Sequence, residues 1–466
     1  ATPEAKGPAV NRHRRRPALL AAALAATVLL AACGSGGGGA AAPGGTTLKM
    51  WTFKQSHVAA LQGAAKSYEA KTGVKVEVQA ITPDDAFITK TQAAAKTGDL
   101  PDVMEVHTNG DDFTFGAAGL LEDLADDVPA DWTKRYRPDV AAEGTVTAQY
   151  YKSSLAAGSK TTGVKEGQRF SVPLTIGTFG IVYGNKERLT QAGITTAPKT
   201  WEEFTAALAA VQKARPTDGG VSLGLKAPST GLEWLMQPMA YGLLGKQPFE
   251  ALWSQDAATN WSSPNGTKVL STYGQITPYW MPGTQTLDID QADLAFAQGK
   301  SSFLVGGTFS LAFLNQNGFD PAKIVTFPVP APATGAVHGL ALSPFALTGL
   351  SVSANTKHKA EAIGFLNHLA DKDVATQFAK DALDVPPVDL GSDPSGVVGP
   401  VLGAMLASFG SGDKAYNPGY TAYRPDNYDS GNVGAVLMEY TPLSRKDAAG
   451  TGADLANLIG SYWNKK

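Results

Sequence analysis

The folded part of the chain opens with apolar and polar residues that alternate. Residues 47–53 (TLKMWTF) and 74–81 (VKVEVQAI) follow the period of two that is typical of a half-buried strand. The segment between them predicts a helix over about 56–71, and a second helix is expected over about 82–98. A third strand is expected over 102–106. Strands and helices that alternate in this way predict a layered α/β lobe with largely parallel strands.

Later segments again show the alternation of strands and the periodicity of helices. Together they make the folded part too long for one hydrophobic core. The folded part runs from about residue 48 to residue 466, and a single hydrophobic core seldom grows beyond about 250–300 residues, so two lobes are expected. The elements predicted here are a strand-like run over 170–183, helices over 200–214, 290–298 and 362–369, and strands over 301–305, 324–329 and 347–353.

The N-terminal segment has the pattern of an export signal. Four arginines within residues 12–16 precede an uncharged apolar run over 18–32, and a basic flank before a short apolar core is typical of a signal peptide. The run is too short to span a bilayer, which takes about 20 residues. The small residues before Cys33, the only cysteine of the chain, resemble a bacterial lipobox, in which the cysteine is lipidated. An ordinary signal peptide that happens to end near a cysteine is the alternative.

Residues 33–47 are rich in glycine and show no apolar periodicity, so they predict a flexible stalk. We therefore expect residues 1–32 to be a signal peptide and Cys33 to carry lipid. This arrangement predicts a protein that is anchored at the outer face of a bacterial cytoplasmic membrane.

Composition limits the classes of function. The chain has 466 residues, of which 43% are hydrophobic and 17% charged, as in an ordinary globular protein. Its formal net charge of −3 becomes −7 without residues 1–32, which carry Lys6, four arginines and Glu4. A mildly acidic body without a basic patch argues against nucleic acid as a partner. A single cysteine allows no internal disulfide, so the core depends on the burial of apolar surface.

Five short segments, in order along the chain, resemble one family. They are YEAKTGVKV at 68–76, GDLPDV at 98–103, the run at 173–185, AGI with PKTWEE at 192–203, and AFAQGK at 295–300. The family is that of the carbohydrate-type extracellular solute-binding proteins of ATP-driven importers, the group of the maltose-binding protein. Here Gly184 separates the tyrosine and the asparagine that are usually adjacent in the family.

The resemblance implies an α/β fold with two lobes, the periplasmic-binding-protein-like fold, with a hinge and an interlobe cleft. Extended segments at 172–175 and 339–348 are suitable hinges, and hinge closure around a ligand is a known route to ligand-coupled signalling. The expected division gives residues 48–173 and 349–405 to lobe 1, and residues 174–348 and 406–466 to lobe 2.

Motifs for other chemistries do not fit the context that they require. Residues 220–224 match G-x-S-x-G, but a nucleophile elbow needs a helix directly after the serine, and a short strand and a loop are expected here. The six histidines show no metal-binding spacing. We therefore expect no catalytic residue, no metal site and no cofactor.

Aromatic side chains at the edges of predicted elements are candidates for sugar contacts. A sugar ring has a face of aliphatic C–H groups that a planar aromatic ring can cover. Trp234, Trp280 and Phe309 are expected to stack on the ligand, since each lies at an element edge where the family usually places a stacking residue. Burial of these rings in the core is the alternative.

Polar side chains that follow predicted strands are candidates for contacts with sugar hydroxyls. Ligands in such sheets bind at the carboxyl ends of strands; Gln55 follows the first strand, and Asn109 and Asp111 follow the third. A plain turn over residues 109–112 is an equal alternative. The expected polar contacts are Gln55, Asn109, Asp111, Thr178, His338 and Arg424, the last in a loop that resembles the family's final contact segment.

Sequence and resemblance together predict an extracellular solute-binding lipoprotein. It is expected to capture a mono- or oligosaccharide, to deliver it to the transmembrane subunits of an ABC-type permease, to act as a monomer, and to touch the membrane only through its lipid. The alternative is a surface receptor or sensor of the same fold that binds a non-sugar solute and has no transport role. An enzyme is a third class, for which the sequence gives no positive signal.

Overall fold

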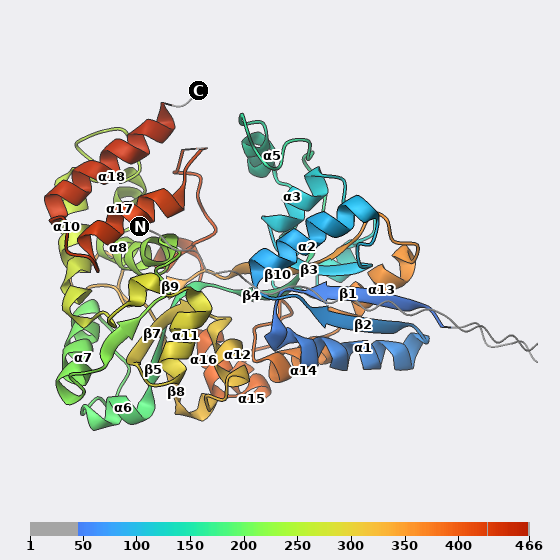
Figure 1. Cartoon of the computed structure of the whole chain (residues 1–466), viewed down its shortest axis with the longest axis horizontal. Helices are drawn as coiled ribbons and strands as arrows, with labels where there is room; N and C mark the ends of the chain where they lie inside the picture. Colours follow the sequence, from blue (N-terminus) through green and yellow to red (C-terminus); the bar gives the residue numbers. More distant parts are fainter. Residues whose placement is uncertain (1–44, 426, 465–466) are drawn as a thin grey trace, which may run out of the picture. The chain divides into compact units, whose positions relative to one another are not determined.

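Two main sheets organise the part of the chain that the structure, a computed structural model, describes, namely residues 45–425 and 427–464. The first sheet has the order β2-β1-β3-β10-β4 (Figure 1). Strands β1 (Thr47–Thr52), β2 (Lys75–Ala80) and β3 (Val103–His107) are parallel, while β10 (Phe345–Val352) runs antiparallel to β3 and to β4 (Val172–Gly177). The three strands expected near the start of the folded part are confirmed.

Alternation along β1 places apolar side chains on both faces of the first sheet. Met50 packs in the core that includes α1 (Val58–Thr72), whereas the next residue, Trp51, packs in a second core that includes Phe87 of α2 (Asp84–Thr97). Successive side chains of a strand point to opposite faces, so both faces need a cover. Figure 1 accordingly shows α1 and α2 on opposite sides of the strands.

The second sheet has the order β6-β7-β5-β8. Strand β6 (Gly219–Ser222) is parallel to β7 (Ser301–Gly307), and β5 (Phe179–Asn185) is antiparallel to β7 and to β8 (Ile324–Pro328). Ser222, the serine of the G-x-S-x-G match, ends β6, is fully buried and shares a hydrogen bond of 2.9 Å with the hydroxyl of Ser301. A loop follows it, as expected from the sequence, so the match is not a nucleophile elbow.

The remaining elements cover these sheets and connect them. Before β10 they are η1 (Gln55–His57), α3 (Asp111–Ala117), α4 (Ala130–Thr133), α5 (Ala148–Ser154), α6 (Lys186–Gln191), α7 (Trp201–Ala214), η2 (Gly231–Met236), α8 (Gln237–Leu244), α9 (Lys246–Ala251), α10 (Pro264–Tyr273), η3 (Gly274–Tyr279), η4 (Thr284–Thr286), α11 (Ile289–Ala297), α12 (Ser310–Gln316), η5 (Pro321–Lys323) and β9 (Ala341–Leu342). After β10 they are α13 (Lys359–Leu369), α14 (Lys372–Ala382), α15 (Pro394–Val398), α16 (Pro400–Ala407), η6 (Gly412–Lys414), β11 (Ala415–Tyr416), α17 (Ser430–Tyr440) and α18 (Ala448–Trp463).

The described chain passes between the two sheets three times. Strand β4 ends at Gly177 in the first sheet and β5 begins at Phe179 in the second, so Thr178 marks the first crossing. The second crossing lies between β8 and β10. The third lies between α14, which packs on α1, and α16, which packs on β8. Each sheet with its helices, called a lobe from here on, therefore combines segments that are distant in sequence.

The third crossing lies earlier than the expected lobe boundary at residue 405. Phe378 of α14 belongs to the core of the first sheet, whereas Leu402 and Met405 of α16 belong to the core of the second. Between them, Val388 still packs in the core of the first sheet, so these contacts favour a boundary between residue 388 and α16. The expected hinge at 172–175 lies within β4, which pairs with β10. The division into lobes itself stays a prediction.

We expect Gly177→Ala to destabilise the protein, because a Cβ at this crossing would overlap the side chain of Thr308 and lie 2.7 Å from Cδ1 of Leu347. Overpacking of this kind typically costs about 1–3 kcal/mol of unfolding free energy, which urea unfolding would measure. The control is Gly460→Ala in α18, where an added methyl meets nothing within 4 Å and should be neutral or stabilising. Equal stability of the two variants would show that the close approach at Gly177 imposes no constraint.

Candidate functional site

A cavity of about 620 Å³, called the cleft from here on, lies between the two lobes. Its first-lobe wall comes from residues 53–56, directly after β1, and from His107 and Thr108 at the end of β3. Its second-lobe wall includes Trp234 and Phe309. Ligands of open α/β sheets bind outside the carboxyl ends of the strands, which makes this cleft the candidate site.

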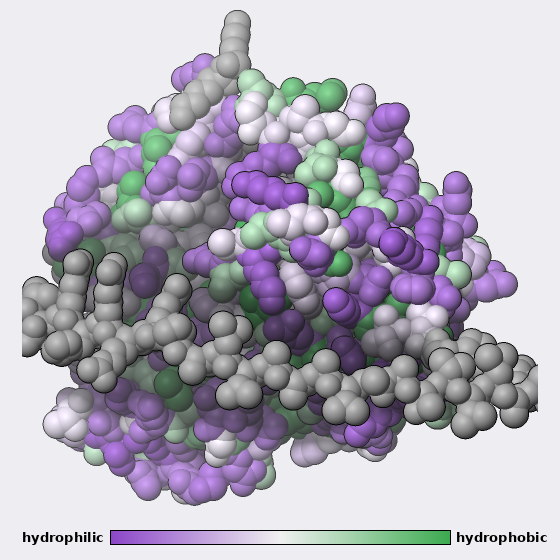
Figure 2. Space-filling view, turned by 45° about the vertical axis from the view of Figure 1, so that its right-hand side comes forward, coloured by the Kyte–Doolittle hydropathy of each residue, from purple (hydrophilic) through white to green (hydrophobic). Residues whose placement is uncertain are grey.

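Four aromatic rings, called the aromatic wall, line one side of the cleft: Phe179, Trp234, Phe309 and Phe345. Phe179 and Trp234 are stacked, with their centroids 4.8 Å apart and their planes at 14°. Phe309 meets Trp234 edge-on at 5.8 Å, and Phe345 meets Phe179 edge-on at 5.3 Å. On the face of the molecule in Figure 2, by contrast, hydrophilic residues predominate and hydrophobic ones form small separate patches. The cleft therefore has an aromatic side, although Phe179 and Trp234 partly cover each other.

The opposite wall carries an imidazole that a carboxylate orients. Asp111, the first residue of α3, lies with Oδ2 2.6 Å from Nδ1 of His107, and the ring of His107 stacks on Phe53 at 4.3 Å. Burial of the ring lowers the pKa of His107, but the hydrogen bond and the charge of Asp111 outweigh it, so the pKa is raised. With Nδ1 engaged by Asp111, Nε2 is the ring nitrogen left for a solute.

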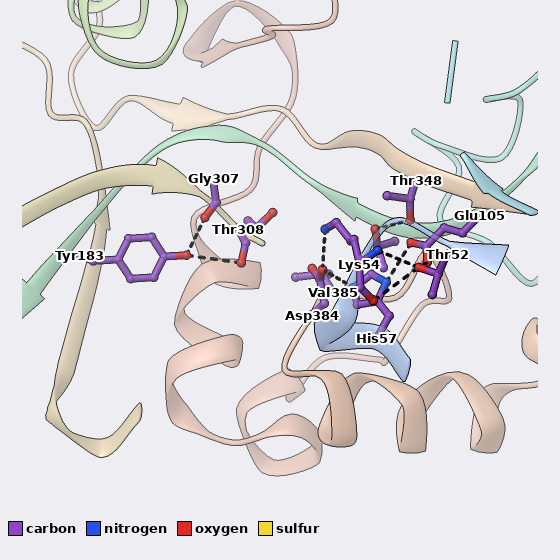
Figure 3. A network of polar contacts seen from close by, with 11 residues as sticks. Thr52, Lys54, His57, Glu105, Tyr183, Gly307, Thr308, Thr348, Asp384 and Val385 are labelled. Atoms are coloured by element: carbon purple, nitrogen blue, oxygen red, sulfur yellow. Dashed lines mark hydrogen bonds and ion pairs between the residues drawn. The ribbon is translucent and has the colours of Figure 1, made fainter. Parts of the chain in front are cut away.

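A chain of four charged side chains, called the charge chain from here on, begins at Lys54 of the first-lobe wall and continues into the interior (Figure 3). His57 is fully buried, with Nδ1 2.8 Å from Glu105 and Nε2 3.0 Å from Asp384, and both carboxylates are fully buried as well. Lys54 adds its ammonium 3.5 Å from Oδ2 of Asp384. The hydroxyl of Thr52 donates to Glu105 at 2.6 Å. The four charges sum to zero when His57 is protonated.

The charge chain shifts the pKa values of its members in opposite directions. Burial alone lowers the pKa of His57, but the two carboxylates outweigh burial, and the pKa is raised. Burial alone raises the pKa of Glu105 and of Asp384, but the cations beside them, His57 and Lys54, outweigh burial and lower both. The imidazolium form is therefore favoured within the fold.

The structure brings some of the expected site residues to the cleft. Gln55, Trp234 and Phe309 line it, although Trp234 is only 6% exposed and one face of its ring is covered by Phe179. Asp111 reaches the cleft through His107. Thr178 is fully buried at the first crossing, where its hydroxyl donates to the carbonyl of Phe179.

Asn109 takes part in a turn, which is the alternative that the sequence left open. Its backbone is left-handed, with φ of 58°, and its side-chain oxygen accepts from the N–H of Gly144 at 3.1 Å. Its amide nitrogen contacts the carboxylate of Glu143. Both ends of the amide are therefore engaged within the first lobe.

Three expected contacts lie away from the cleft. Trp280 is 8% exposed in the core of the second lobe, and its Nε1 donates to Thr441 at 3.0 Å. His338 lines a different cavity, beside α9. Arg424 is tied to Glu233 by a pair of 2.9 Å and stands over the ring of Tyr428 at 4.9 Å. Cys33 lies outside the described residues.

Sequence reasoning missed several residues that line the cleft. Phe53 and Lys54 directly precede the predicted Gln55, and His107 precedes Asn109, so the strand-end rule that selected Gln55 and Asn109 applies to them too. Phe179 and Phe345 carry no such signal, because the pairing of β4 with β10 brings them together.

Metal binding and membrane insertion can be judged from the side chains and helices of the described residues. In residues 45–425 and 427–464, no group of three His, Cys, Asp or Glu side chains is arranged to hold a metal ion. Over the same residues, the helices are all too short or too polar to cross a bilayer.

The model of one protein family, bacterial extracellular solute-binding protein, matches residues 54–376. Among curated proteins, no sequence gives a significant match.

Similar solved structures share the fold at low identity. One, reported for xylan utilization by the bacterium Caldanaerobius polysaccharolyticus, has a TM-score of 0.66 and 18% identity over 89% of this chain and 100% of that one. A solute-binding protein of Thermotoga lettingae, bound with α-D-tagatose, gives 0.64 and 19% over 90% and 100%. The GacH receptor of Streptomyces glaucescens, also studied with acarbose, gives 0.60 and 17% over 91% and 100%.

We expect the charge chain to make stability depend on pH in the neutral range. Because the folded-state pKa of His57 is raised above its ordinary 6.5, the stability that its charge adds is complete below about pH 6.5 and is lost as pH rises through the folded value. Urea unfolding of the parent and of His57→Gln between about pH 6 and pH 9 should show a difference of about 3–5 kcal/mol at the acidic end that shrinks as pH rises.

The matched control is His338→Gln, since His338 is exposed and lies outside the charge chain. Its stability should follow that of the parent at every pH. A difference between the parent and His57→Gln that stays constant with pH would show that His57 is not charged in the folded protein.

Proposed function

We propose, because the chain belongs to the bacterial extracellular solute-binding proteins, that it captures a small carbohydrate between its two lobes and delivers it to an ABC-type sugar permease. The observation that carries the choice of carbohydrate is the cleft itself. Its lining combines the aromatic wall with polar groups from Gln55 and His107 of the first lobe. An apolar face opposite hydrogen-bonding groups suits a sugar ring, which has a C–H face and a rim of hydroxyls.

The similar structures support carbohydrate as the first solute class to test. They were described in connection with xylan utilization, α-D-tagatose and acarbose, and another structure of the same fold, RafE, is in complex with raffinose. These statements concern those proteins, at 17–19% identity to this chain. They supply a panel of sugars for this one.

The alternative function keeps the same cleft. A surface receptor or sensor without a permease would bind its solute by the same contacts, and that solute need not be a sugar. Binding to amino acids, polyamines or peptides, with no response to sugars, would favour this alternative. A pair of neighbouring genes for multispanning permeases would favour transport.

The site of action that fits this function is the outer face of the cytoplasmic membrane. Cys33 would carry the lipid, and residues 33–47 would connect it to the folded part, which begins at β1. The protein would bind its solute as a monomer, since one chain supplies both walls of the cleft.

Isothermal titration with a sugar panel tests the proposed function. Xylotriose, raffinose, maltotriose, tagatose and acarbose, each added to the full chain, should include at least one that binds with Kd of about 1 μM or tighter, which corresponds to about 8 kcal/mol. Mass analysis after incubation should return the sugar unchanged. Absence of binding throughout the panel, together with binding of another solute class, would overturn the choice of carbohydrate.

We expect Phe309→Ala to weaken the binding of that sugar. Stacking of an aromatic ring on a planar ligand is worth about 1–3 kcal/mol by alanine substitution in nucleic-acid complexes, and a ring that covers one sugar face should contribute a comparable amount. The matched controls are Phe319→Ala, just beyond α12 and outside the cleft, and Trp463→Ala near the C-terminus. Unchanged affinity and enthalpy in Phe309→Ala would assign this ring to packing alone.

We expect Cys33→Ala to release the protein into the medium or to stall its processing, because the lipid would then have no attachment point. Fractionation of cells and blotting for the protein would measure this. A serine elsewhere in the stalk, Ser35→Ala, is the control and should leave the protein in the membrane fraction. A Cys33→Ala protein that stays membrane-bound at the mature size would contradict the anchor.

A further inference from the structure

The ammonium group of Lys54 lies at the cleft and forms an ion pair with one carboxylate. Lys54 lines the cleft, and its side chain is 17% exposed. Within the described residues, the close partners of its ammonium are Oδ2 of Asp384 at 3.5 Å and the ring of Phe309, whose centroid is 5.2 Å away. An ammonium carries three N–H donors, so donors remain for a solute that enters the cleft beside Lys54.

Two hydrogen bonds, one with Thr52 and one with His57 of the charge chain, fix the backbone of Lys54. Its N–H donates to the hydroxyl of Thr52 at 2.9 Å, and that hydroxyl in turn donates to Glu105 at 2.6 Å. Its carbonyl accepts from the N–H of His57 at 3.1 Å. The side chain therefore leaves the backbone from a position that the buried histidine and glutamate determine.

Asp384 of the charge chain fixes the direction of the Lys54 side chain. Asp384 is held by His57 at 3.0 Å and by the N–H of Val385 at 2.9 Å, so it cannot follow the ammonium into the cleft. Figure 3 shows Lys54 and His57 both reaching Asp384. The carboxylate thus acts as a fixed anchor point for a flexible cation.

Charge compensation by Asp384 determines the kind of ligand group that Lys54 suits. A lysine without a partner would attract an anion through its full charge, whereas an ammonium paired with a carboxylate has little field beyond its own hydrogen bonds. Its remaining donors suit the lone pairs of neutral oxygens. A further polar atom lies nearby. The buried hydroxyl of Thr108, a residue that lines the cleft, has no hydrogen-bond partner among the described residues.

We infer that Lys54 is a solute-contacting residue that donates hydrogen bonds to hydroxyl oxygens of a neutral sugar, with Asp384 and His57 as the positioning residues behind it. This assignment rests on the proposed function and deepens it, because it selects neutral sugars over acidic ones. The sugar would lie with a C–H face toward the aromatic wall and a hydroxyl edge toward Lys54.

Substitution of Lys54 tests this assignment with the sugar of the panel that the parent binds. Lys54→Met keeps an unbranched side chain over Phe309 and removes the donors, so titration should show affinity lowered about 10- to 100-fold, as for loss of a hydrogen bond to a charged group. Lys54→Arg keeps charge and donors and should bind more tightly than Lys54→Met. Lys49→Met, on the exposed face of β1, is the matched control and should bind like the parent.

Deoxy analogues of that sugar separate contact from mere structural support. The parent should lose affinity for at least one monodeoxy analogue, and Lys54→Met should no longer distinguish that analogue from the complete sugar. A structural role alone would lower the affinity for both compounds equally. Urea unfolding of each variant establishes that the protein titrated is folded.

Acidic sugars test the positioning role of Asp384. Trigalacturonate should bind the parent more weakly than the neutral sugar does. Asp384→Asn leaves Lys54 without its counter-charge, so it should shift preference toward trigalacturonate, and this gain should fade between about 0.05 M and 0.5 M NaCl. The comparison of Lys54→Met with Lys54→Arg decides the contact itself if Asp384→Asn does not fold.

Two failures are distinguishable. If the parent binds a neutral sugar and Lys54→Met binds it equally well with the same preference among deoxy analogues, the assignment of Lys54 is overturned and the proposed function stands. If the parent binds no sugar at all, the proposed function fails, and the assignment fails with it.

Discussion

A histidine buried between two carboxylates holds together the three parts of the chain that form the back of the cleft. His57 lies in the turn after β1, Glu105 lies on β3 at the centre of the first sheet, and Asp384 lies in the third connection between the lobes. Removal of one partner from such a buried ion pair costs about 3–5 kcal/mol of stability, because the charge that remains is buried without a counter-charge or water. The connection is fixed further at Val385, whose carbonyl accepts from the N–H of Ile176 on β4 at 2.9 Å. Beyond Val385 the connection stays tied to the first lobe, because the N–H of Arg137 donates to the carbonyl of Pro387 at 2.8 Å.

The aromatic wall belongs to the crossings rather than to either lobe alone. Phe179 directly follows the first crossing, and Phe345 begins the strand that returns from the second. Behind these rings, the hydroxyls of Thr175 and Thr348 share a hydrogen bond of 2.8 Å between β4 and β10. A rotation of one lobe against the other thus acts on the strands that carry the rings, and packing among the rings changes with the opening of the cleft. This packing would connect solute binding to lobe closure, as in proteins whose hinge lies next to the ligand.

The sequence predicted the first lobe's strands and helices well, because each depends on a local period and a local stop. Gly73 and Gly98, for example, end α1 and α2 in left-handed backbone conformations. Glycine adopts this conformation readily, so the residue type alone predicts where each helix ends. The site was harder to predict, since Trp234 and Trp280 were both expected at element edges, yet one lines the cleft and the other is tied to Thr441 in the core. That difference arises from tertiary packing, which leaves no trace in the spacing of either tryptophan. The contacts of α16 with β8, which favour a boundary earlier than residue 405, likewise leave no trace in the sequence pattern.

Two cationic side chains of the first-lobe wall are paired with carboxylates within the protein. Lys54 has Asp384 and His107 has Asp111, so each cation presents directed hydrogen-bond donors with little long-range field. Under the proposed function, selection among solutes would depend on whether their hydroxyls meet these donors at hydrogen-bond distance, because a buried donor left unmatched costs binding energy. Such donors sit on segments that follow the strands, whereas the sheets are shared with structures at 17–19% identity. The sheets determine where a solute binds and the segments after the strands determine which one, so one fold can serve proteins whose solutes differ as much as tagatose and acarbose.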